Sequence, residues 1–251
     1  MKLLPILFGA LVSLPHFEQK VGSQLPLAAV WRDEAGRPAT LGSCLQPAQP
    51  AVVVFGYYRC AQLCSVIERS TVDTLRSLRP SVGRDYTFIY LSIDPTDTPE
   101  AARGERAAAI RAYGRGDSAQ GWHYLTGGAE VIAETAAAAG FQYRYDAPSK
   151  QYEHPAGFLL VTPSGIVARD FFGIDAAPDA LAGALRRAGE GRTGPSIFAV
   201  LIECFHGGID SSPRERVIWD GIWAAVSLTV VGLGGFIGWM LHEERRKART
   251  A

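Results

Sequence analysis

The stretch "AVVVFGYYRCAQLCSVIERS", residues 51–70, decides the fold of this chain. Residues 51–58 are mostly β-branched or aromatic, which predicts a buried strand. Apolar residues then recur at roughly helical spacing over residues 65–78, which predicts a helix. The cysteines between them, Cys60 and Cys64, therefore follow the carboxyl end of a strand, where α/β folds keep their functional sites.

Strands and helices alternate along the rest of the chain before a late hairpin. Short strands are expected on either side of a turn at residues 34–36, and the late hairpin turns at residues 163–165. This order predicts an α/β sandwich of three layers, with a mixed central sheet and helices on both faces. The other predicted strands cover residues 85–94, 121–127 and 141–146, and the other predicted helices cover residues 100–113, 129–140 and 177–189.

The composition limits the classes of function. With 251 residues, of which 47% are hydrophobic, the chain can form one substantial domain with appendages. Its 25 Lys and Arg balance its 25 Asp and Glu, and the sequence contains no long internal basic block. A nucleic-acid partner is therefore not expected.

Both ends of the chain predict contact with a membrane. Residues 1–23 open with one Lys and a short apolar run, which is typical of a secretory signal peptide. Near the other end, residues 218–241 include a long uncharged run with Trp at both edges, which predicts a transmembrane helix. The tail, residues 242–251, is rich in Arg and Lys, so the positive-inside rule places it in the cytoplasm.

These features divide the chain into five parts. Between the signal peptide and the membrane helix lie a folded domain over residues 24–192 and a linker over residues 193–217. The predicted location is the inner, cytoplasmic membrane, crossed once by a C-terminal anchor. The folded domain then faces the outer, periplasmic side, which agrees with an export signal. A buried N-terminal element and a buried core helix are the less favoured interpretations of the two apolar runs.

Two nearby thiols in an exported domain have three ordinary uses, namely a structural disulfide, a redox dithiol or a clamp for a soft metal. If Cys60 and Cys64 lie in the first turns of the predicted helix, the helix dipole stabilises their thiolates. The three residues between them leave room for a metal between the sulfurs. Two thiolates and one imidazole suit Cu(I), and they also accept Cu(II) or Zn.

The best candidate for a third ligand is His154, just ahead of the predicted strand that begins at residue 157. Pro155 favours an extended backbone at His154, which suits a ligand that projects from a loop. A solvated loop histidine is the alternative interpretation. Weaker candidates lie in the predicted signal, a short strand and the tail, namely His16, His123 and His242.

Four segments occur in the order "VVVFGYYRCAQLCS", "YLSIDPTDTPEAA", "WHYLTG" and "EHPAGFLLVTPSG". Together, within residues 24–189, they resemble the SCO/SenC family, copper-binding proteins of thioredoxin-like fold that help to assemble the dinuclear copper centre of cytochrome c oxidase. The resemblance implies a thioredoxin-like domain in which Cys60, Cys64 and His154 bind copper. It places Asp94, in the "SIDP" motif, either behind the copper ligands or at the start of the next helix.

Three positions depart from the family pattern. The family usually has His before and Pro after the first cysteine, and Pro after the second, where this chain has Arg59, Ala61 and Ser65. Arg59 adds a positive charge that favours a thiolate but opposes a bound cation. The balance between metal binding and redox chemistry is therefore open at this point.

The first hypothesis for function is a membrane-anchored copper metallochaperone, which needs no enzymatic turnover. Its cargo is copper, as Cu(I) or Cu(II), and its partners are the copper-accepting subunit of cytochrome c oxidase and other copper chaperones. The second hypothesis is a thiol-disulfide oxidoreductase, with Cys60 and Cys64 as a catalytic redox pair that reduces the apo copper site or acts in redox sensing. A purely structural disulfide is less favoured, because so short a loop constrains little of the unfolded chain.

Two other cysteines have no assigned role. Cys204 and His206, in "CFHGGID", are a candidate accessory copper site near the membrane, or a packed cysteine with an exposed histidine. Cys44 could pair with Cys204 or stay free.

Overall fold

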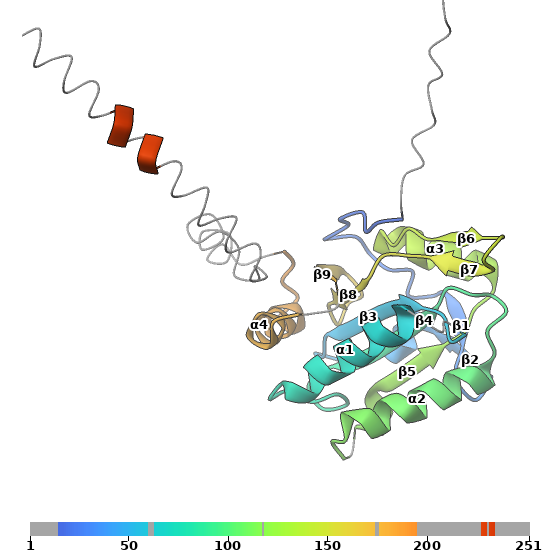
Figure 1. Ribbon diagram of the computed structural model, residues 1–251. Coiled ribbons are helices and arrows are strands. Elements are labelled where there is room, and N and C mark those ends of the chain that lie inside the picture. The colour runs from blue at the N-terminus through green and yellow to red at the C-terminus, as the bar shows by residue number, and fades with distance from the viewer. Residues whose placement is uncertain are drawn as a thin grey trace, which may run out of the picture. The chain divides into compact units, whose positions relative to one another are not determined.

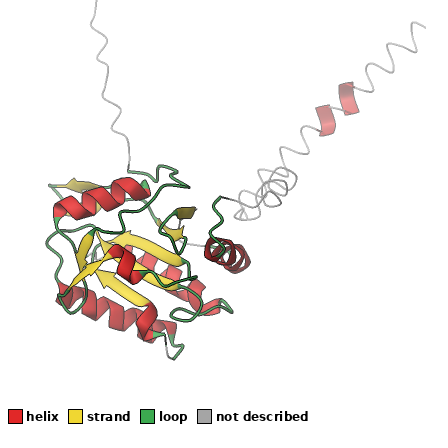
Figure 2. Ribbon diagram, turned by 180° about the vertical axis from the view of Figure 1, so that it is seen from behind, coloured by secondary structure: helices red, strands yellow, loops and turns green. Residues whose placement is uncertain are grey.

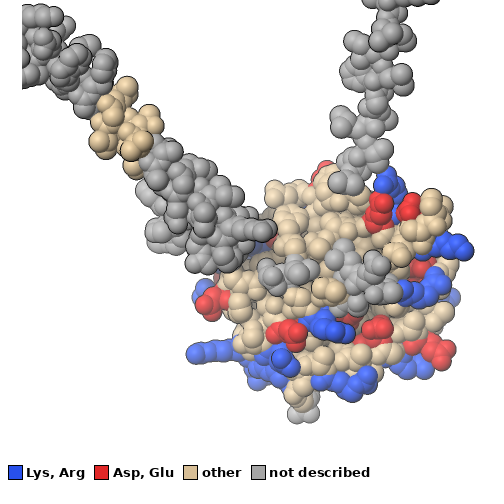
Figure 3. Space-filling view, viewed as in Figure 1, with Lys and Arg blue, Asp and Glu red and all other residues tan. Residues whose placement is uncertain are grey.

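A computed structural model describes residues 15–59, 63–116, 118–173, 176–194, 227–229 and 231–233. The chain divides into two compact units, Met1–Pro195 and Ser196–Ala251, and the first of these contains the folded domain shown in Figure 1. On the face of the molecule seen in Figure 3, basic and acidic side chains lie interspersed, as their equal numbers in the sequence suggest.

A five-stranded mixed sheet forms the centre of the domain, with strand order β5-β4-β3-β8-β9. Strands β3, β4 and β5 are parallel, whereas β8 is antiparallel to both β3 and β9. The five strands are β3 (Ala51–Gly56), β4 (Thr87–Ser92), β5 (Trp122–Leu125), β8 (Gly157–Val161) and β9 (Val167–Phe172). Two small antiparallel pairs accompany the sheet, β1 (Val30–Arg32) with β2 (Pro38–Thr40), and β6 (Arg144–Asp146) with β7 (Gln151–Glu153).

Helices cover both faces of the sheet, because its central strands are buried on both sides and need apolar cover on each. On one face pack α1 (Leu63–Ser77), α2 (Pro99–Tyr113) and α4 (Pro178–Gly189). On the other face pack α3 (Ala129–Ala139) and the short 3-10 helix η1 (Leu41–Cys44), while a second short one, η2 (Ala119–Gly121), precedes β5. Figure 2 shows the strands between helices, and the predicted three-layer sandwich with a mixed sheet is confirmed.

The helix ends follow the local sequence signals. Thr98 caps α2, because its hydroxyl accepts a hydrogen bond from the Ala101 N–H at 3.2 Å. Gly140 ends α3 in the left-handed region, with φ 73°. A Cβ at Gly140 would lie 2.0 Å from the Glu18 carbonyl oxygen, so both the backbone angle and the close contact require glycine.

The predicted strand over residues 141–146 is wrong in its first half. Phe141 is buried in the core against Phe55, with ring centroids 4.7 Å apart, and only residues 144–146 pair as a strand. Their partner, β7, was not predicted, because its three residues are too few to show a period.

The packed domain begins before the predicted boundary at residue 24. Phe17 is buried, with its ring centroid 5.2 Å from that of Phe141. The Glu18 N–H donates to the Gly140 carbonyl at 2.7 Å, and the Gly22 N–H donates to the Val167 carbonyl at 2.8 Å. The last third of the segment assigned to the signal peptide is therefore part of the domain, while residues 1–14 lie outside the described residues.

The predicted membrane helix over residues 218–241 lies outside the described residues, except for the helical residues 227–229 and 231–233. Nearly all of the linker and the whole tail, residues 242–251, also lie outside them. Within the part of the chain that the structure describes, no helix combines the length and the hydropathy needed to cross a membrane.

Glu68 on α1 is a buried carboxyl that packs under the sheet and accepts a hydrogen bond from the Tyr124 hydroxyl. Burial raises the pKa of Glu68 from 4.5 to about 7. A raised pKa in the folded state means that the folded chain holds this proton more tightly than the unfolded chain. The free energy of unfolding should therefore fall as the pH rises from about 4.5 to about 7.

We predict that Glu68→Gln removes this loss of stability, because the neutral amide oxygen still accepts from Tyr124. Urea unfolding should show the variant roughly 1 to 3 kcal/mol more stable than the wild type at pH 8, and nearly equal to it at pH 5. The exposed Glu130→Gln is the matched control and should follow the wild type at both pH values. Equal stability of Glu68→Gln and wild type at pH 8 would contradict the prediction.

Candidate functional site

The segments that carry Cys60, Asp94 and His154 in the sequence meet at one edge of the sheet. Strands β3 and β4 are parallel, so the loops that follow them, residues 57–62 and 93–98, leave from the same edge. Strand β8 runs antiparallel to β3, with Val53 opposite Leu159, so β8 begins at that edge. His154 stands just before β8, and the topology therefore brings it to the loop that carries Cys60.

The two cysteines are placed only in part. Cys60 lies outside the described residues, and Cys64 belongs to the first turn of α1, with its side chain outside them as well. Among the described side chains no three His, Cys, Asp or Glu residues form a group that could hold a metal ion. That set leaves out both predicted thiolate ligands, so the predicted copper site is not tested by it.

The His154 ring is half-buried and lies beside the start of the cysteine loop. Its centroid is 6.2 Å from that of Tyr57 and 5.9 Å from that of Phe141. The Nδ1 atom lies 3.0 Å from the Pro155 carbonyl oxygen. When Nδ1 carries a proton for that carbonyl, Nε2 keeps the lone pair with which an imidazole binds a metal. Burial lowers the pKa of His154, which favours the neutral ring that such binding needs.

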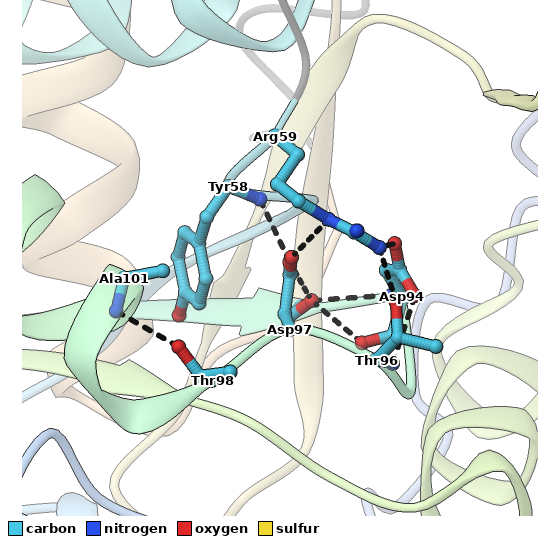
Figure 4. A network of polar contacts seen from close by, with 8 residues as sticks. Tyr58, Arg59, Asp94, Thr96, Asp97, Thr98 and Ala101 are labelled. Atoms are coloured by element: carbon cyan, nitrogen blue, oxygen red, sulfur yellow. Dashed lines mark hydrogen bonds and ion pairs between the residues drawn. The ribbon is translucent and has the colours of Figure 1, made fainter.

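Arg59, the residue before Cys60, reaches across to the loop after β4 (Figure 4). Its Nη2 lies 2.7 Å from Oδ2 of Asp94 and also donates to the Thr96 hydroxyl. Its Nε lies 3.5 Å from Oδ1 of Asp97. The guanidinium therefore covers two carboxylates, of which the Asp97 side chain is 0% exposed while Arg59 is 62% exposed.

Asp97 also fastens the backbone of the cysteine loop. Its Oδ2 accepts a hydrogen bond from the Tyr58 N–H at 2.8 Å and another from the Ser92 hydroxyl at 2.7 Å. One buried carboxylate thus joins the loop after β3 to the end of β4. The contact of Asp97 with Tyr58, 39 residues away in the chain, had no local signal in the sequence.

The two carboxyls respond differently to their surroundings. Burial acts to raise the pKa of Asp94, but hydrogen bonds from Thr96 and then Arg59 outweigh it and hold the pKa below its ordinary value. Burial raises the pKa of Asp97 above its ordinary value, despite the bonds from Ser92 and Tyr58. Asp94 does not cap α2, because Thr98 has that role, so its place is at the side of the cysteine loop.

Of the two other cysteines, the structure describes only Cys44. Cys44, the last residue of η1, is free and buried in the core. Burial raises the pKa of its thiol to about 11, which disfavours the reactive thiolate. Cys204 and His206 lie outside the described residues, and the accessory site stays a prediction.

The fold and the loop with its cysteine pair define a thioredoxin-like α/β protein. The chain matches the SCO1/SenC family over residues 34–189 and belongs to that family. A search of curated proteins found no match.

Three solved structures have a similar fold, at identities that support the fold alone. A protein from Aquifex aeolicus VF5 has a TM-score of 0.58 at 20% identity, covering 68% of this chain and 95% of its own. A SCO1/SenC family lipoprotein from Bacillus anthracis has a TM-score of 0.54 at 19% identity, covering 69% and 99%. ScoI of Arabidopsis thaliana, a structure with copper bound, has a TM-score of 0.53 at 16% identity, covering 68% and 99%.

We predict that Asp97→Ala destabilises the domain by about 2 to 4 kcal/mol, because it removes the buried acceptor of both the Tyr58 N–H and the Ser92 hydroxyl. Asp97→Asn should cost less, since the amide oxygen still accepts from Tyr58. Urea unfolding at pH 7 measures both changes.

The control is Asp73→Ala, which removes an exposed acid of α1 that lies 3.6 Å from Arg76. It should change stability by no more than about 0.5 kcal/mol. An Asp97→Ala variant as stable as this control would show that Asp97 does not hold the cysteine loop.

Proposed function

We propose that this member of the SCO1/SenC family is a membrane-anchored copper metallochaperone that serves the copper centre of cytochrome c oxidase. Cys60, Cys64 and His154 bind copper and pass it by ligand exchange to the copper-accepting subunit of the oxidase. The observation that carries the proposal is the position of His154. Its ring lies 6.2 Å from that of Tyr57, which is three residues before Cys60 in the chain.

The ligand set suits copper on chemical grounds. Two thiolates and one neutral imidazole are soft and intermediate donors, which Cu(I) accepts with few ligands. Cys64 lies in the first turn of α1, where unpaired N–H groups and the helix dipole favour a thiolate. Copper is here the cargo, and the copper-bound relative from Arabidopsis supports the choice of metal for this fold.

The charge of Arg59 does not oppose this function, since two acids offset it. A lone guanidinium next to Cys60 would repel a cation. Asp94 at 2.7 Å and Asp97 at 3.5 Å place two carboxylates against the guanidinium, so these three side chains together carry no net positive charge. The contacts of Asp94 and Asp97 with the cysteine loop also replace the rigidity that prolines give this loop in the usual family pattern.

A second candidate function rests on Arg59 as well. A guanidinium beside a thiol favours the thiolate, which is the form that attacks a disulfide. In this alternative Cys60 and Cys64 cycle between dithiol and disulfide and reduce the cysteines of the apo copper site. His154 has no part in that reaction, which gives a way to separate the two functions.

We predict that the reduced full chain, in detergent, binds one copper per chain. Cys60→Ser, Cys64→Ser and His154→Ala should each lower the affinity for Cu(I) by about 100-fold or more, because each removes one of three ligands. Equilibrium competition with a Cu(I) chelator measures the affinity. The matched controls are Cys44→Ser and His16→Ala, which should keep the wild-type affinity.

Disulfide reduction by the same variants separates the alternatives. Two results together would reject the chaperone and support the oxidoreductase. In that case His154→Ala keeps the wild-type affinity for copper, and Cys60→Ser abolishes disulfide reduction.

The membrane anchor belongs to the same proposal. We propose that residues 218–241 cross the inner membrane and hold the domain on its periplasmic side, where tethering raises its effective concentration near the oxidase. Alkaline carbonate should leave the full chain in the membrane fraction, whereas a chain ending at residue 217 should be released. External protease should digest the domain in spheroplasts. Release of the full chain by carbonate would contradict the anchor.

A further inference from the structure

A pocket of about 360 Å³ lies beside Arg59, between the loops after β3 and β4 and the β6–β7 hairpin. Its walls include three tyrosines, two cations and one acid, namely Tyr57, Tyr145, Tyr152, Arg59, Lys150 and Asp94. We infer that this tyrosine pocket docks an acidic, extended segment of the protein that receives copper. The inference rests on the proposed function, since it assigns the surface through which the copper would be handed over.

The tyrosine pocket is adjacent to the predicted copper ligands. Tyr57 forms part of its wall, and the same ring lies 6.2 Å from that of His154. Tyr152, in β7 of the hairpin, also lines the pocket, and His154 follows it two residues later in the chain. A segment bound in the pocket would therefore lie next to the imidazole that must be exchanged when copper leaves.

The tyrosines form a packed surface in advance of any partner. The Tyr152 ring lies 5.4 Å from that of Tyr57 and 5.0 Å from that of Tyr145, and Tyr143 packs on its other side at 6.0 Å. Tyr145 nevertheless remains 51% exposed. Exposed tyrosines whose rings are already held by neighbours lose little freedom on binding, and Tyr and Arg are enriched at the centres of protein interfaces.

The charges of the lining favour an acidic partner. Arg59 and Lys150 are positive, and the one acid in the lining, Asp94, is paired with Arg59 at 2.7 Å. The fully buried Asp97 is not part of the lining. Of the acids of the hairpin, Glu153 is paired with Arg144, whereas Asp146 accepts a hydrogen bond from Ser149 and keeps its charge, but neither acid is part of the lining. Within the lining, the positive charge that no lining acid offsets is that of Lys150.

Lys150 is held in a backbone conformation that costs free energy. Its φ is 55°, and Ala48 is the other non-glycine residue with a positive φ among those described. Such a conformation is strained for a residue with a Cβ, and strained positions of this kind gather at functional sites. Lys150 lies at the turn of the hairpin and forms part of the wall of the pocket. Glycine would adopt this φ without strain, but it would bring no charge to the pocket.

The test measures docking and copper transfer separately. The probe is the purified copper-accepting domain of the oxidase subunit from the same organism, apo and reduced. Titration calorimetry with the full chain in detergent gives the dissociation constant without copper, and stopped-flow spectroscopy of the copper-loaded chain gives the transfer rate.

Lys150→Glu should weaken docking and slow transfer about 5- to 20-fold at low ionic strength, with a smaller effect at high salt. Tyr145→Ala should weaken docking about fivefold at either salt concentration, and Tyr145→Phe should weaken it less. Copper affinity and thermal unfolding should stay at wild-type values, because both side chains are outside the ligand set and Tyr145 is half-exposed.

The matched control is Arg79→Glu, an exposed charge reversal at the opposite edge of the sheet, beside the start of β3. It should leave docking unchanged.

Wild-type docking by Lys150→Glu and Tyr145→Ala would overturn the inference while copper binding stands. Self-association that Tyr145→Ala abolishes would assign the pocket to a second copy of the chain and overturn it too. A chain that docks the probe but holds no copper would reject the proposed function alone.

Discussion

The buried carboxylate of Asp97 is the contact on which the geometry of this site depends. It accepts the N–H of Tyr58 and the hydroxyl of Ser92, and it lies under the guanidinium of Arg59. A carboxylate with no exposure is costly unless hydrogen bonds and an opposite charge compensate it. Here those partners come from the loop after β3 and from the end of β4, while Asp97 itself belongs to the loop after β4. The compensation that keeps Asp97 buried therefore also keeps the two loops together.

The mixed sheet supplies the rest of the arrangement. Parallel strands alone would bring together the loops after β3 and β4, but not a residue that precedes a strand. Because β8 is antiparallel to β3, the residue ahead of β8 arrives at the same edge as the residues that follow β3. This reversal of one strand places His154 beside Tyr57, and it explains how a histidine far along the chain can serve the cysteine loop.

Arg59 shows how a departure from a family pattern can be offset locally. The family usually has histidine at this position, and a positive charge there would oppose a cation. The two acids after β4 supply the opposite charge, and the Thr96 hydroxyl supplies a further acceptor. The guanidinium thus links the cysteine loop to its neighbour and also forms part of the tyrosine pocket. Loop anchoring and a charged pocket wall come from the same side chain.

By itself the sequence determined what depends on local pattern. The β-branched run predicts β3, helical spacing predicts α1, and a turn at residues 163–165 predicts the hairpin of β8 and β9. The ordered motifs also identified the SCO/SenC resemblance, which the family match confirms. These features need only neighbouring residues, because helix caps, turns and hydrophobic periods act over a few positions.

The tertiary structure alone decided which distant residues meet. The bond from Tyr58 to Asp97 joins residues 39 positions apart, and the pairing of β6 with β7 builds a pocket from strands too short to show a period. It also decided that Phe17 belongs to the core. Phe17 is buried against Phe141, which lies far along the chain. Such contacts follow from sheet register and from the exclusion of water from the core, and neither can be read from a single stretch of chain.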